Sequence, residues 1–329
     1  MNRHIFLLLS LLCLSTFIIS GCKTDSTSPN NNTSGASGTI IFGAPSSDAD
    51  CYSYDLSTKQ SKLIFSNALD PYLLPTGDIL FQEPAPFYGG GNVKLRSVSA
   101  NGVTKTTLLD LQAVTLYVQT APKASRNGKY ININYWNMTS NTPLYGGAAT
   151  ILLNSDGTTI GAVDSLFDGS WAPDGSLVLS GSTESSHQIE TPLVEGLYKL
   201  SSDFSSITTI NNTLDKPLYP AVSPDGSRIA FITNKHVWVI NMDGSGLRQV
   251  TTGSKEESRP CWSPDGKWIA CSSYGTFEVS YYTALAIVPS TPAAPIDLTN
   301  DSQYWPRDPS LQSTSTLGRL NPGNTITWK

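Results

Sequence analysis

The chain has 329 residues, a formal net charge of −5 and only 14% charged residues. Because this weak acidity provides no basic footprint, the charge gives no support to nucleic-acid binding. Cys13 and Cys22 lie in the N-terminal segment. The other three cysteines allow at most one internal pair, which excludes a disulfide framework.

The N-terminus is typical of a bacterial secretion signal. Arg3 is followed by an apolar run from Ile5 to Ile19, which is short for a transmembrane span. The next residues, up to Cys22, resemble the lipobox, in which such a cysteine is lipidated. The resemblance implies a signal peptide over residues 1–21 and a multiply acylated Cys22 that anchors stably in the membrane. The alternative is an ordinary secretory signal followed by an incidental cysteine.

The segment after the lipidation site is predicted to be a flexible tether. Residues 23–37 contain no large apolar side chain, so their ordering could not be offset by burial. The tether therefore covers residues 22–37. The protein is expected in the cell envelope as a membrane-anchored lipoprotein, on the periplasmic face of the outer membrane if the cell is Gram-negative.

A glycine turn followed by alternating apolar residues recurs along the rest of the chain. Residues 222–233 read VSPDGSRIAFIT and residues 262–273 read WSPDGKWIACSS. Related turns place glycine at positions 38, 77, 128, 175, 226 and 266, at intervals of 39 to 51 residues. Intervals in this range are typical of propeller blades or another repeat array.

Each turn has a local explanation. Proline presets the first central position, Asp or Asn tolerates the second, and glycine takes the left-handed position, which predicts a three-residue hairpin loop. Two further strand candidates follow each turn, so each unit is predicted to be a four-stranded meander. The residues predicted to shape turns and carry no chemistry are Asp174, Gly175, Asp225, Gly226, Asp265 and Gly266.

The first unit lacks its innermost strand. Residues 304–310, YWPRDPS, look like the start of other units and are predicted to fill this gap and close a ring of six blades. A chain cut at residue 300 is then expected to unfold or aggregate. The propeller is assigned to residues 38–311, followed by a C-terminal tail over residues 312–329.

The repeat resembles that of the TolB type, in which Ser-Pro-Asp-Gly precedes Ile-Ala-Phe and a later strand ends in Met-Asp-Gly-Ser. Residues 218–300 match best. The resemblance implies an all-β, six-bladed propeller over nearly the whole folded region. TolB also carries an α/β domain before its propeller, where this chain has only the tether. The partners of TolB are therefore not transferred.

No catalytic, metal-binding or cofactor-binding set is predicted. Only His187 and His236 follow the signal peptide, no Gly-x-Ser-x-Gly elbow occurs, and no zinc or phosphate motif is present. The residues Trp171, Trp262 and Trp305 occupy equivalent positions before their turns, which predicts packing between blades.

Two cysteines flank one predicted hairpin. If Cys261 faces Ile269, then Cys271 is a diagonal neighbour on the same face, roughly 7–8 Å away. This distance is near or beyond the limit for a disulfide, about 7 Å between Cα atoms. The geometry favours buried thiols.

Two functions remain open. The favoured one is a lipid-anchored, monomeric, non-catalytic scaffold for an envelope protein or glycan ligand. Its binding surface is expected on the ring face where the longer connections gather, around residues 84–92, 137–148 and 181–195. The alternative is a glycan-active hydrolase or lyase with its site in the central channel, built from acids and arginines of several blades.

Overall fold

The protein is described here from a computed structural model. It describes residues 35–43, 50–83, 93–99, 105–111, 116–118, 121–137, 148–181, 195–277, 280–299, 304, 306 and 326–329. Cys22 and nearly all of the predicted tether lie outside this set. Every regular element in the described part is a β-strand. Within these ranges, no helix is long and apolar enough to cross a membrane.

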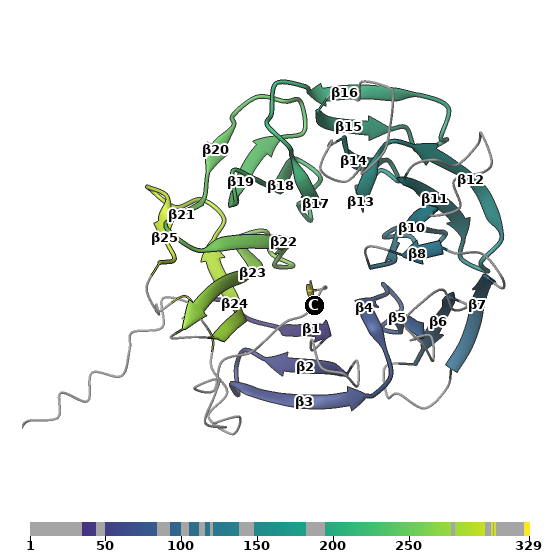
Figure 1. Cartoon of the computed structure of the whole chain (residues 1–329), viewed down its shortest axis with the longest axis horizontal. Helices are drawn as coiled ribbons and strands as arrows, with labels where there is room; N and C mark the ends of the chain where they lie inside the picture. The colour runs from purple at the N-terminus through teal and green to yellow at the C-terminus, as the bar shows by residue number, and fades with distance from the viewer. Residues whose placement is uncertain are drawn as a thin grey trace, which may run out of the picture. The chain divides into compact units, whose positions relative to one another are not determined.

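The strands form six antiparallel blades arranged in a ring around a central channel, which confirms the predicted six-bladed propeller (Figure 1). The innermost strand of each blade lines the channel and later strands lie progressively outward. Blade one contains β26 (Ile326–Trp328), β1 (Thr39–Gly43), β2 (Cys51–Asp55) and β3 (Gln60–Phe65). Blade two contains β4 (Leu69–Leu73), β5 (Ile79–Glu83), β6 (Val93–Val98) and β7 (Lys105–Leu111).

Blade three has an interrupted innermost strand, because β8 (Leu116–Val118) and β9 (Lys123–Ala124) both pair with β10 (Tyr130–Asn137). It continues with β11 (Ala148–Asn154) and β12 (Thr159–Asp164). Blade four contains β13 (Phe167–Trp171), β14 (Leu177–Gly181), β15 (Gly196–Leu200) and β16 (Ile207–Asn211). Blade five contains β17 (Leu218–Val222), β18 (Arg228–Thr233), β19 (His236–Asn241) and β20 (Arg248–Gln249).

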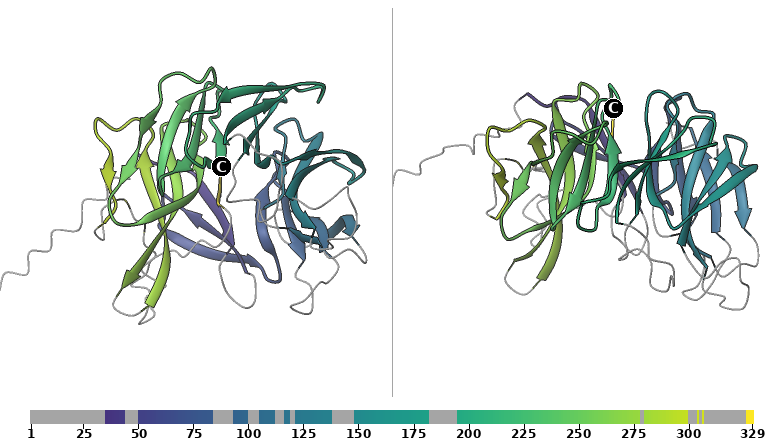
Figure 2. Two further views of the ribbon diagram at one scale, coloured as in Figure 1. Left: turned by 45° about the horizontal axis from the view of Figure 1, so that its top comes forward. Right: turned by 90° about the horizontal axis from the view of Figure 1, so that it is seen from above.

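Blade six differs from the other blades at its outer edge. Its ladder contains β22 (Glu256–Trp262), β23 (Trp268–Phe277) and β24 (Ser280–Pro289), and the last two extend past the ends of their neighbours (Figure 2). In place of a fourth antiparallel strand, β25 (Ile296–Asp297) pairs in parallel with β21 (Thr251–Thr252) of the connection from blade five. The backbone of Tyr304 occupies the edge of β24, where its carbonyl accepts from the Ile287 amide at 2.8 Å.

The ring is closed by a C-terminal strand, as predicted, but the position of that strand was predicted wrongly. The residues paired with β1 are those of β26, with Ile40 opposite Trp328 and Phe42 opposite Ile326. The Thr39 amide also donates to the carbonyl of Lys329 at 2.8 Å. The segment 304–310 was favoured because it resembles the start of other units. β26 has no glycine turn after it and gave no such signal.

The turns between the first and second strands fall into two lengths. In blades three, five and six the loop contains four residues, since the amides of Ser125, Ser223 and Ser263 donate to carbonyls five residues later. In blades two and four it contains three, as predicted. The longer loops all begin with serine. In blade five the hydroxyl of Ser223 donates to the Asp225 carboxylate at 2.6 Å and accepts from the Arg228 amide at 2.9 Å.

The additional loop residue shifts the register of blade six by one position. Cys261 lies opposite Ala270, not Ile269, and Trp262 lies opposite Ile269. Cys261 shares the face of Ala270, and neighbouring residues of a strand point to opposite faces, so Cys261 points away from Cys271. The prediction that the two cysteines share a face was wrong. Both thiols are free, as is that of Cys51.

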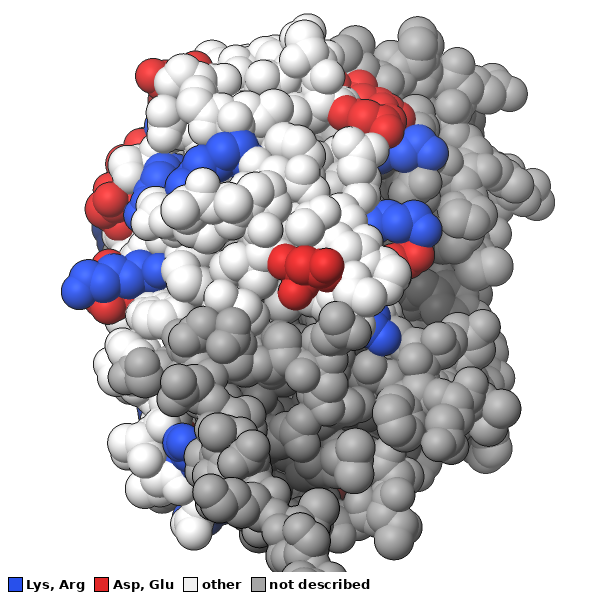
Figure 3. Space-filling model, turned by 90° about the vertical axis from the view of Figure 1, so that its left-hand side faces the viewer, with Lys and Arg blue, Asp and Glu red and all other residues white. Residues whose placement is uncertain are grey.

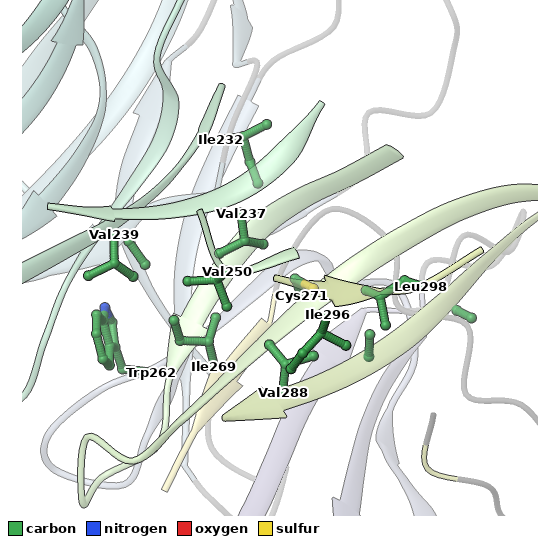
Figure 4. Packing of buried hydrophobic residues seen from close by; sticks show 13 residues of the cluster. Ile232, Val237, Val239, Val250, Trp262, Ile269, Cys271, Val288, Ile296 and Leu298 are labelled. Atoms are coloured by element: carbon green, nitrogen blue, oxygen red, sulfur yellow. The ribbon is translucent and has the colours of Figure 1, made fainter. Parts of the chain in front are cut away.

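Tryptophans join neighbouring blades, as predicted for two of them. The indole of Trp262 donates to the Ala221 carbonyl of blade five at 2.8 Å, and that of Trp171 to the Lys123 carbonyl of blade three at 3.3 Å. Trp305 lies outside the described residues. Between blades five and six, Trp262 belongs to an apolar cluster with side chains such as Val239 and Ile269 (Figure 4).

Truncating Trp328 is expected to destabilise the ring. This side chain is 8% exposed, and its indole donates to the Ser37 carbonyl at 2.8 Å. Trp328→Ala should lower the free energy of unfolding by about 3–5 kcal/mol, as for other buried aromatic truncations. Urea denaturation measures this change, with the exposed Lys62→Ala as control. Equal midpoints for Trp328→Ala and the parent chain would contradict the role of β26 in closure.

Candidate functional site

The end of the channel that carries the glycine turns contains a cavity of about 470 Å³. The last two residues of each innermost strand line it, so every blade contributes one pair. Strand pairing shows that these positions are equivalent, because the final residue always lies opposite the first core residue of the second strand. The first members of the six pairs are Tyr72, Lys123, Ser170, Ala221, Cys261 and Thr327.

Deeper along the innermost strands, a second set of equivalent residues has left-handed backbone. Their φ angles are 52° at Asp70, 54° at Asp168, 52° at Tyr219 and 55° at Arg259. The strand register shifts at each of these points. Left-handed backbone costs L-residues roughly 1–2 kcal/mol, and bulky residues such as tyrosine and arginine rarely adopt it. Such strain concentrates at functional sites in proteins.

Asp168 is the most enclosed charged residue of this second set, with 4% exposure. Its carboxylate accepts from the Asn134 side chain at 3.2 Å and from the Tyr219 amide at 3.4 Å. Asn134 in turn accepts from the hydroxyl of Thr150 at 2.9 Å. Burial raises the pKa of Asp168, and the charges of Lys123 and Arg259 partly offset that rise.

Two cations accompany Asp168 in the channel. The guanidinium of Arg259 lies over the ring of Tyr219, 4.9 Å from its centroid, which is a cation–π arrangement. Lys123 comes from blade three, and burial lowers its pKa while the charge of Asp168 raises it. The channel thus combines a buried carboxyl group with two basic side chains from three blades.

A third basic side chain crosses the turn-bearing mouth of the cavity. Arg126 extends from the turn of blade three to the turn of blade five, past blade four. Its guanidinium donates to the carbonyl of Ser223 at 2.9 Å and to that of Pro224. Partial burial lowers the pKa of Arg126.

Two acidic groups in the cavity wall remain protonated at neutral pH. Burial raises the pKa of Tyr72 to about 12, and burial likewise raises that of Cys261 to about 12. The raised pKa of Cys261 disfavours the thiolate, which is the reactive form of cysteine. The described residues contain no group of three or more His, Cys, Asp or Glu side chains suited to a metal ion.

A second buried polar cluster joins blades five and six. His236 lies 2.8 Å from Glu257, which also accepts from the hydroxyl of Thr251 at 2.7 Å. Thr251 accepts in turn from the Val237 amide. Burial raises the pKa of Glu257, and the hydrogen bonds from His236 and Thr251 act against that rise. The threonine bonds to the carboxylate and not to the imidazole, so this is not a nucleophilic triad.

The residues singled out from the sequence lie apart from the charged group. Three separate turns contain the residues Asp174, Asp225 and Asp265. In the turn of blade five, hydrogen bonds from Ser223 and Ser227 lower the pKa of Asp225 to about 2. The three long connections and Cys22 lie outside the described residues. No sequence motif singles out the channel residues, although a proline or glycine after each left-handed residue marks the repeated position.

Substituting Asp168 should change how stability depends on pH. Because its folded pKa is raised above 3.8, the native state binds the proton more tightly. Stability therefore falls as pH rises from about 3.8 through the raised pKa. Asp168→Asn should remove this fall, which urea denaturation at stepped pH would detect.

Asp225→Asn is the matched control for that experiment. The folded pKa of Asp225 is lowered to about 2, so its contribution is present above 3.8 and is lost as pH falls toward 2. The difference in folding stability between variant and parent should therefore change with pH in opposite directions for the two variants. Parallel curves for Asp168→Asn and the parent chain would contradict the burial argument.

Solved structures with the same architecture include TolB from Acinetobacter baumannii, with a TM-score of 0.58 and 15% identity over 88% of this chain and 66% of that one. This chain thus spans slightly less than two thirds of that TolB. A protein assigned as TolB from Agrobacterium tumefaciens has a TM-score of 0.51 and 18% identity, covering 77% of this chain and 87% of its own.

An oligogalacturonate lyase from Vibrio parahaemolyticus has a TM-score of 0.50 and 11% identity, covering 74% of this chain and 69% of its own. No family model matches the chain. At these identities the likeness concerns the fold alone. The described part of the chain has a TolB-like β-propeller fold.

Proposed function

We propose that this chain is a lipid-anchored propeller of the cell envelope that acts as a non-catalytic scaffold and binds a protein or small ligand at its central channel. The observation that carries the proposal is the cavity at the turn-bearing end. Its volume of about 470 Å³ falls within the range of ligand pockets, roughly 300–1,000 Å³. Three tryptophans, Trp171, Trp262 and Trp328, contribute to its lining.

The rest of the described surface offers less support for a binding site. On the side of the ring shown in Figure 3, basic and acidic side chains are interspersed. The exposed large apolar residues are distributed over different blades, for example Leu63 of β3, Ile160 of β12 and Ile207 of β16.

Lipid anchoring depends on Cys22 and can be tested directly. Cys22→Ala should abolish incorporation of labelled palmitate and release the protein from the membrane fraction, because the tether alone has no large apolar side chain to insert. Membrane fractionation and metabolic labelling measure both effects. Cys51→Ala is the control, since Cys51 is a buried thiol within blade one. Unchanged labelling of Cys22→Ala would exclude this anchor.

Binding at the channel can be tested by photo-crosslinking in the native envelope. A photoreactive amino acid replacing Ala221 would lie in the cavity wall, whereas one replacing Lys62 would lie on an exposed outer strand. Mass spectrometry should identify a ligand or partner crosslinked from position 221 and absent from position 62. The same products from both positions would argue against a channel site.

A second function, a glycan-active hydrolase or lyase, is favoured by one observation. Asp168, Lys123 and Arg259 bring an acid with a raised pKa and two cations into the same channel. Groups with shifted pKa values in a cleft are candidates for acid–base catalysis. Release of new reducing ends from oligogalacturonate, abolished in Asp168→Asn, would support this function over the scaffold.

A further inference from the structure

The cavity has an electrostatic character that differs from that of the whole protein. The chain carries a net charge of −5, yet among the described residues that line the cavity the charged side chains are those of Lys123, Arg126 and Lys329, and none of these described residues is Asp or Glu. A partly enclosed site concentrates the field of such charges because little water screens them. The charged side chains that the described cavity wall offers to a ligand are therefore basic.

In the described part of the chain, the charge of Lys123 has no hydrogen-bonded or ion-paired partner. Asp168 acts on Lys123 electrostatically, and burial disfavours its charged form. A desolvated charge without a bonded partner is costly, and an anionic ligand would relieve that cost.

Arg126 is held by neutral acceptors. Its guanidinium donates to two backbone carbonyls of the blade-five turn, at Ser223 and Pro224. A guanidinium has five N–H donors, so donors remain for a further acceptor. Charge-assisted bonds to carboxylate or phosphate are roughly twice as strong as bonds between neutral groups. An anion in the cavity can thus share this side chain with the carbonyls or displace them.

We propose that the cavity binds the anionic group of a small polar ligand, a carboxylate or a phosphate, between the ammonium of Lys123 and the guanidinium of Arg126. This inference rests on the proposed function, since it names the chemical class of ligand for the same cavity. Arg126 also spans the mouth, so the ligand contacts it on entry from the turn-bearing face.

The test compares three sugars with one common body. D-galactose is neutral, D-galacturonate adds a carboxylate, and D-galactose 6-phosphate adds a phosphate. Calorimetry on the full chain in a non-ionic detergent measures their affinities, and the fluorescence of the cavity tryptophans gives a second readout. At least one charged sugar should bind about tenfold or more tightly than galactose. The stronger of the two identifies the preferred anion.

Variants separate charge from shape. Lys123→Met and Arg126→Gln should each weaken binding of the charged sugar about tenfold or more, while Lys123→Arg should retain it. The control Lys62→Gln, on the exposed outer strand, should leave affinity unchanged. Thermal melting of each variant checks its folding.

Three outcomes would overturn the proposal. These are equal affinity for the three sugars, no measurable binding of any of them, and a preference for the charged sugar that survives in a Lys123→Met, Arg126→Gln double variant. Crosslinking from position 221 tests the proposed function independently. A channel partner captured there, together with no preference for anions, would refute the anion site and leave the scaffold function intact.

Discussion

The pairing of β26 with β1 is the constraint on which the rest of the structure depends. It joins residues 326–328 to residues 40–42 by a three-residue ladder and completes the first blade. Without it, blade one would expose an unpaired inner edge and blade six would lose part of its apolar cover. It also supplies Thr327 and Trp328, so the cavity obtains its sixth wall from the strand that closes the ring.

A smaller constraint sets the direction of side chains within each blade. Where the turn begins with serine, the serine hydroxyl accepts a hydrogen bond from the amide two residues after the glycine. These loops contain one residue more than the loops that begin without serine. Leu74 and Ala172 start the shorter turns and have no hydroxyl to accept such a bond. Because side chains alternate along a strand, one loop residue decides which blade a side chain meets. This is why Cys261 and Cys271 lie on opposite faces of blade six.

The blade number, the all-β class and the need for closure were predictable from the turn glycines, because those residues recur at blade spacing and have a specific backbone role. The closing strand was not, since Ile326–Trp328 is too short to show a pattern and no turn follows it. Blade six also lacks the fourth antiparallel strand that the repeat predicted for every unit. Ile296 is apolar at the expected position, but only the fold shows that β21 is its neighbour.

The channel residues illustrate another limit of a single sequence. Tyr72, Lys123 and Cys261 have nothing chemical in common, so no motif groups them. They form a group only when the innermost strands are aligned on their pairing with the second strands. The charge cluster around Asp168 combines residues from blades three, four and six, and its existence depends on closure of the whole ring.

The parallel pairing of β21 with β25 links blades five and six, so that the two blades should open together. The amides of Ile296 and Leu298 donate to Val250 and Thr252 across the outer rim, and the bond between His236 and Glu257 joins the same two blades farther inward. Local opening follows cooperative units that share hydrogen bonds and apolar contacts. These two blades should therefore exchange their amide protons together. Transient opening of the ring should begin at an interface between other blades.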